Sequence, residues 1–152
     1  MSSNRKHFDK NLYAAFDQKA KDKVQELLKA YPDLKSCGSP IKTDVDLMVY
    51  RDRDHIFNIE TEVKAVWTSD DFPYDSVQFP YRKLKYCILT KPTLFVMFNA
   101  KMNKYLSVTS YDMMHSPVNM VRNKYVKFGE DFFQVPLDKV SFNALAIDKL
   151  GV

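Results

Sequence analysis

Two neighbouring stretches, DVDLMVY at residues 44–50 and NIETEVKAVW at residues 58–67, decide the fold expected of this chain. Polar and apolar residues alternate in both, which is the pattern of β-strands that bury one face. The segment between them begins with RDRDH at residues 51–55, a composition typical of a hairpin loop. The sequence therefore predicts two strands that are joined by a tight connection and lie side by side.

The alternation gathers charged groups on one face of this hairpin. Asp44 and Asp46 share a face of the first strand, and Glu60, Glu62 and Lys64 share a face of the second. Carboxylates this close raise one another's pKa unless a cation lies between them, and a divalent metal ion is the cation expected here. The alternative is a solvent-facing row of acids in which the lysine is a salt-bridge partner.

This arrangement resembles the PD-(D/E)XK nuclease superfamily, whose signature is an acidic residue at the end of one strand and Glu-x-Lys on the next. Asp46 matches the first acid, and Glu62-Val63-Lys64 matches the Glu-x-Lys element. Val45 stands where the signature has proline. Because Asp44 and Glu60 are alternative acids, the assignment of metal ligands stays open.

The composition is that of one folded domain. A chain of 152 residues has the length of a single domain, and its 45% hydrophobic residues and 3 glycines leave no need for long linkers. We therefore expect one domain over residues 1–152. The resemblance implies an α/β fold with a restriction-endonuclease-like core, in which helices flank a central mixed β-sheet. The net charge of +4 favours a polyanionic partner without requiring one.

Several other kinds of site are excluded by residue spacing. The three histidines, His7, His55 and His115, lack the paired spacing of a zinc site, and three isolated glycines cannot form a Gly-rich phosphate loop. Cys37 and Cys87 do not form a Cys-x-x-Cys pair, which suits a reducing compartment. With no apolar run of membrane-spanning length, we expect a soluble cytoplasmic protein.

The rest of the chain predicts helices and strands in an order that fits this core. Helix, strand, strand, helix and buried strand is the order of a restriction-endonuclease-like core. The predicted elements beyond the hairpin are an amphipathic helix over residues 8–31 ended by Pro32, a connection over 32–43, a helix from Pro80 to residue 89, a buried strand over 92–100, its hairpin partner over 104–109, a short helix over 111–117 and a last strand over 132–137.

The resemblance implies a role for each residue of the signature. Asp46 and Glu62 would bind Mg²⁺ or Mn²⁺ together with the main-chain carbonyl of Val63. Lys64 would orient or deprotonate the attacking water. Glu60 has three open interpretations, namely a ligand of a second metal ion, a group that supports the ligands, or a surface residue.

The helix that follows the Glu-x-Lys strand lies beside the metal site in similar folds and supplies phosphate contacts. Arg82 and Lys83 are therefore candidate nucleic-acid-binding residues, and Gln78 is a weaker candidate just ahead of them. The alternative is a short helix with basic surface residues.

The resemblance thus implies a hydrolase, a metal-dependent endonuclease that cuts phosphodiester bonds, with DNA as the expected substrate. Nothing in the sequence separates DNA from RNA. Small nucleases of this class often act as dimers, so a homodimer is one expected form. Two other functions stay open, namely a non-catalytic nucleic-acid-binding module of the same fold and a structural or interaction protein.

Overall fold

A computed structural model describes residues 10–40, 45–123 and 126–152 of the chain. The helices are α1 (Lys10–Leu28), α2 (Leu84–Cys87) and α3 (Ser110–Met114), with the 3-10 helices η1 (Tyr81–Lys83), η2 (Leu137–Lys139) and η3 (Ile147–Leu150). The strands are β1 (Leu34–Gly38), β2 (Leu47–Arg51), β3 (Asp54–Lys64), β4 (Ser76–Pro80), β5 (Thr93–Asn99), β6 (Tyr105–Thr109), β7 (Val118–Asn123), β8 (Val126–Pro136) and β9 (Ser141–Phe142). No described helix is both long and apolar enough to span a membrane.

The central sheet is mixed. Its six strands lie in the order β1-β2-β3-β5-β6-β9. β3 and β5 are parallel, and every other neighbouring pair is antiparallel. The connection from β3 to β5 carries β4, η1 and α2. The predicted α/β class, with helices flanking a mixed central sheet, is confirmed, and so is the β2–β3 hairpin.

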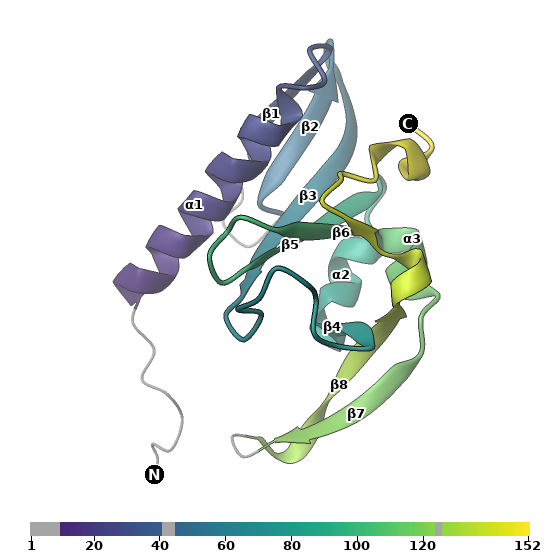
Figure 1. The fold of residues 1–152 in the computed structure, drawn as a ribbon. Coiled ribbons are helices and arrows are strands. Elements are labelled where there is room, and N and C mark those ends of the chain that lie inside the picture. Colours follow the sequence, from purple (N-terminus) through teal and green to yellow (C-terminus); the bar gives the residue numbers. More distant parts are fainter. Residues whose placement is uncertain (1–9, 41–44, 124–125) are drawn as a thin grey trace.

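The first helix covers one face of the central sheet (Figure 1). Ala20, Val24 and Leu28 recur every four residues, so they form one stripe along α1, and all three are buried. They belong to the same apolar cluster as Phe57 and Ile59 of β3. This core fixes the position of α1 against the strand that carries the Glu-x-Lys sequence.

The opposite face of the central sheet packs against a second core. A three-stranded sheet with the order β4-β8-β7 contributes Phe79 and Phe133, and the central sheet contributes Phe95. Trp67, just beyond β3, is buried in the same cluster. Because both faces are covered, all seven residues of β5 are buried, as the apolar run predicts. The β7–β8 hairpin extends away from the central sheet (Figure 1).

The hairpin differs in detail from the prediction. Arg51, Asp54 and His55 belong to the strands, so the turn contains only residues 52 and 53. Asp52 has φ 56°, a left-handed conformation that aspartate tolerates in tight turns. β3 ends at Lys64, because the chain turns at residues 65 and 66. Asp46, expected within the first strand, lies just before β2, and Asp44 lies outside the described residues.

Two predicted segments are wrong. The connection over 32–43 contains β1, a strand whose burial pattern shows no alternation because it lies at the edge of the sheet. The helix from Pro80 to residue 89 is instead the end of β4, followed by η1 and the four-residue α2. Pro80 closes a strand whose Val77 and Phe79 are buried, an alternation that was visible in the sequence. The last strand is also longer than predicted, since β8 begins at Val126.

Candidate metal and phosphate site

The candidate site lies where β3 loses one of its two neighbouring strands. β2 pairs with β3 only as far as Ile59, which lies opposite Leu47. β5 pairs with β3 from Asn58 to Lys64. Within the described chain, the segment from Glu60 to Lys64 therefore has a partner strand on one edge only. Its free edge leaves backbone donors that side chains can use.

Asp46 is bonded to this free edge. Its Oδ2 atom accepts hydrogen bonds from the backbone N–H of Thr61 at 2.8 Å and from Thr61 Oγ1 at 3.1 Å. In return, the backbone N–H of Asp46 donates to Glu60 Oε1 at 2.9 Å. The carboxylate thus takes the place of the missing strand; two hydrogen bonds fix its orientation, and a third holds the Asp46 backbone.

Glu60 is a buried residue, so the interpretation of it as a surface residue is wrong. Its exposed fraction is 6%, and its Oε2 atom lies 3.4 Å from Lys83 Nζ. Burial raises the pKa of this carboxyl to about 7, and the neighbouring Asp46 acts in the same direction. Lys83 opposes both effects. Since each oxygen of Glu60 already has a protein partner, Glu60 supports Asp46 and anchors Lys83.

Glu62 differs from Glu60 because its carboxylate has no such partner. No hydrogen bond or ion pair joins it to another residue of the described ranges. Burial raises the pKa of Glu62, and the charges of Lys83, Lys64 and Arg82 act in the opposite direction. Glu62 also lines a pocket. A partly buried carboxylate with cations around it and no hydrogen-bond donor is suited to bind a ligand.

Lys64 lies two residues further along the same face of β3. Burial lowers its pKa from the ordinary value of 10.5, while Glu62 acts in the opposite direction. Its Nζ atom lies 5.2 Å from the centre of the Tyr74 ring. A lysine in this setting gives up its proton more easily than an exposed one, which is the property required of a general base.

The pocket beside Glu62 has a volume of about 370 Å³ and lies between α1, β3 and η1. Arg82 and Lys83, the candidate nucleic-acid-binding residues, line it together with Glu62. Arg82 also pairs with Glu130 of β8 at 2.9 Å, although most of its side chain is exposed. Gln78 does not reach this pocket and lines a second pocket with Lys64.

Two residues of α1 join the site without having been singled out from the sequence. Lys21 Nζ lies 3.3 Å from Asp17 Oδ2 and 3.9 Å from Asp46 Oδ1. Asp17 and Lys21 are four residues apart, so the sequence alone is sufficient to predict an ion pair along the helix, next to the buried Ala20. The sequence does not show that this pair faces the start of β2, because the docking of α1 decides it.

The donor set is compatible with a hard divalent cation. No group of three or more His, Cys, Asp or Glu side chains converges as a metal site within residues 10–40, 45–123 and 126–152. Asp46 and Glu62, which interact electrostatically, offer carboxylate oxygens, and the main-chain carbonyl of Val63 lies between the latter and Lys64. A set of oxygen donors suits Mg²⁺ or Mn²⁺, which usually retain several water ligands.

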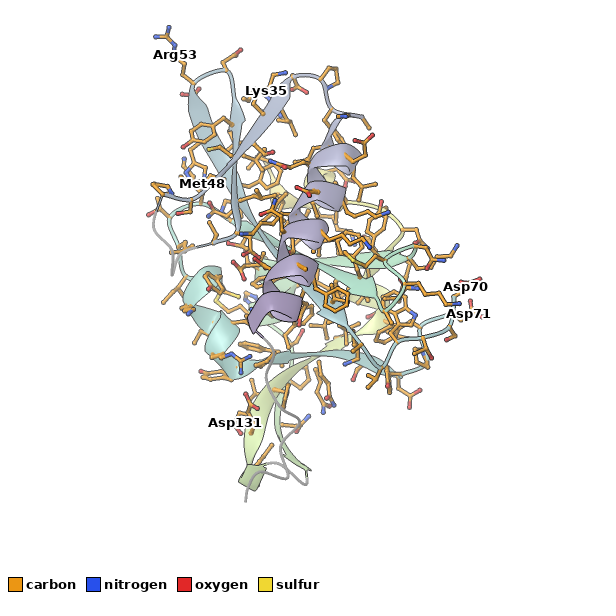
Figure 2. The ribbon with its side chains drawn as sticks, turned by 90° about the vertical axis from the view of Figure 1, so that its left-hand side faces the viewer. Lys35, Met48, Arg53, Asp70, Asp71 and Asp131 are labelled. Carbon is orange, nitrogen blue, oxygen red and sulfur yellow. The ribbon has the colours of Figure 1, made fainter. Side chains whose placement is uncertain are left out.

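The exposed acids of the loop after β3 take no part in this site. Asp70 and Asp71 lie at the outer edge of the molecule (Figure 2). Comparison of the chain with known protein families, with curated proteins and with solved structures finds no match.

Proposed function

We propose that this chain is a metal-dependent nuclease of the restriction-endonuclease-like type that hydrolyses phosphodiester bonds of nucleic acid. One observation carries the proposal. The Asp46 carboxylate is bonded to Thr61 at the free edge of β3, and the next residue along that strand is Glu62, whose carboxylate has no partner among the described residues. An acid just before β2 is thus bonded to β3 beside its Glu-x-Lys sequence.

Asp46 and Glu62 are the side chains that would hold Mg²⁺ or Mn²⁺, with the carbonyl of Val63 as a further donor. When bound, such an ion lowers the pKa of a water molecule and stabilises charge on the phosphate oxygens. Glu60 is assigned a supporting role, because its two oxygens already accept from the Asp46 backbone and pair with Lys83.

Lys64 is the proposed proton acceptor for the attacking water. Its lowered pKa supports this role, because at a given pH the Lys64 amine is neutral in a larger fraction of molecules than an exposed lysine is. Lys83 and Arg82 line the pocket beside Glu62 and would supply positive charge for the phosphate. β3 packs in the first apolar core, and Tyr81 of η1 contacts Phe133 of the second core at a ring-centroid distance of 5.1 Å.

The test is cleavage of plasmid DNA and of labelled RNA in Mg²⁺ or Mn²⁺ and in EDTA. We expect cleavage with metal only, and a loss of about 10²- to 10⁴-fold in Lys64→Ala, the range for removal of a positioned general base. We expect Glu62→Gln to lose cleavage as well, because an amide cannot replace a charged ligand.

Matched controls change the same residue types away from the site. Glu26→Gln removes an exposed glutamate whose partner is Lys29 on the same helix. Lys35→Ala removes an exposed lysine of β1 (Figure 2). Both controls should cut like the wild type. Salt-sensitive binding without cutting, unaffected by EDTA, would replace the proposal with a non-catalytic binding module.

A further inference from the structure

We infer that a second pocket, next to Lys64, accepts an unpaired nucleobase, which makes single-stranded or locally unpaired nucleic acid the preferred substrate. The inference rests on the proposed function and deepens it. The pocket has a volume of about 430 Å³ and is lined by Lys64, Tyr74, Asp75, Ser76 and Gln78. Lys64 lines this pocket and Glu62 lines the first one, so two residues of the Glu-x-Lys sequence, two positions apart on β3, line the two pockets.

Tyr74 provides an aromatic surface at a fixed position. Its exposed fraction is 41%, and its ring contacts Phe72 edge to face at a centroid distance of 5.4 Å. Phe72 in turn contacts the buried Trp67 at 5.1 Å. The ring is thus held by the core; Lys64 Nζ lies over it at 5.2 Å from its centre, and the residue is still partly open to solvent. Exposed aromatic rings held in this way are the surfaces on which bases of single strands stack.

The polar groups of the pocket match a base better than a phosphate. Within the described residues, the side chains of Asp75, Ser76 and Gln78 make no hydrogen bond or ion pair. A glutamine amide presents one donor group and one acceptor, the pattern found on base edges. The carboxylate of Asp75 accepts from the N–H groups of a base and repels a phosphate. The phosphate therefore belongs with Lys83 and Arg82 in the first pocket.

The position of β4 keeps these groups accessible. β4 is the end strand of its sheet and pairs with β8 alone in the described part of the chain. Gln78 lies opposite Gln134, whose Oε1 atom accepts a hydrogen bond from Asn119 Nδ2 at 2.9 Å. A row of amide side chains therefore leads from the pocket across three strands, and such groups can contact the neighbouring nucleotides of an extended strand.

Only an unpaired base fits this description. In a duplex the faces of each base are covered by its neighbours and its Watson–Crick edge is already bonded. A base that stacks on Tyr74 and bonds Gln78 must have left the helix or never have been in one. The scissile phosphate of the same strand would then lie in the first pocket, beside Glu62.

The experiment measures binding of the wild-type protein, in EDTA, to a short fluorescein-labelled oligonucleotide, single-stranded or annealed to its complement. We expect tighter binding of the single strand. Tyr74→Ala should weaken that binding about tenfold, as removal of one stacking contact does, and Tyr74→Phe should retain it. Gln78→Ala should weaken it by a smaller factor. Tyr111→Ala, which removes a tyrosine with an exposed fraction of 66% on α3, is the matched control and should change nothing.

Equal binding of single strand and duplex, or equal binding by Tyr74→Ala and Tyr74→Phe, overturns the inference. Because the assay contains no metal ion, its outcome is independent of cleavage. Metal-dependent cutting of duplex with no effect of Tyr74→Ala leaves the nuclease proposal in place and removes the base pocket. Tyr74-dependent binding of single strands without any metal-dependent cutting would support the base pocket and overturn the nuclease proposal.

Discussion

The two halves of β3 differ in their neighbouring strands and in the residues that they expose. Up to Ile59 the strand pairs with β2, and Phe57 and Ile59 have no exposed surface. From Glu60 to Lys64 only β5 pairs with it among the described strands, and the polar face holds three ionisable groups. Because the pairing with β2 ends at Ile59, a backbone donor of the second half of β3 is free to bind the Asp46 carboxylate.

The largest expected contrast is in stability. Phe57→Ala in the paired half should lower the free energy of unfolding by about 3–5 kcal/mol, because it removes a fully buried ring and leaves a cavity. Glu62→Gln in the other half should cost no stability, since it removes a partly buried charge without breaking a hydrogen bond. Urea denaturation of both variants measures this. Similar losses in the two variants would show that the halves do not differ as described.

The next contrast concerns pH, measured in EDTA. Folding raises the pKa of Glu60 from 4.5 to about 7, so the folded state binds this proton more tightly than the unfolded state does. The resulting contribution to the free energy of unfolding is complete below pH 4.5. That contribution, about 3 kcal/mol from the size of the shift, is lost as the pH rises through 7. Asp46 and Glu62 are shifted in the same direction.

Urea denaturation at pH 5 and pH 8 tests this pH dependence. The wild type should be less stable at pH 8, and Glu60→Gln should show a smaller difference because one titrating group is absent. Stability that is constant or rises between these pH values would contradict the raised pKa of Glu60.

A smaller effect concerns the hydroxyl that orients Asp46. Thr61→Val removes the 3.1 Å hydrogen bond to the carboxylate but keeps the backbone bond. Under the nuclease proposal we expect about a tenfold loss of Mn²⁺ affinity, the lower end for removing a partner of a ligand. Isothermal titration calorimetry measures the loss, and Thr61→Ser, which keeps the hydroxyl, should bind Mn²⁺ like the wild type. Equal affinities in all three proteins would argue against Asp46 as a ligand.

The smallest effect lies outside β3. Arg82→Ala breaks a largely exposed ion pair with Glu130, so we expect less than about 1 kcal/mol in unfolding free energy. Because the proposed role of Arg82 is phosphate contact, binding to nucleic acid should weaken and become less sensitive to salt. Thermal unfolding and a salt titration of binding separate the two roles. An unchanged salt dependence would remove Arg82 from the proposed interface.

Local patterns were enough to predict the elements that carry strong periodicity. The hairpin of β2 and β3, the helix α1 and the buried β5 all follow from spacing of apolar residues. β1 was not predicted, because an edge strand buries few side chains and its residues show no polar–apolar alternation. β4 was missed because Pro80 suggested a helix start, although Val77 and Phe79 alternate with polar residues.

Strand periodicity was enough to predict that Glu60, Glu62 and Lys64 share a face of β3, whereas Asp46, expected within the preceding strand, lies just before β2. The contacts of each acid depend on how distant segments pack together. Because the pairing with β2 ends at Ile59, Thr61 is free to donate to Asp46. The packing of η1 brings Lys83 to Glu60. Of the three acids Asp46, Glu60 and Glu62, Glu62 alone has no partner in the described chain. Register and docking are set by the two cores, which no local pattern contains.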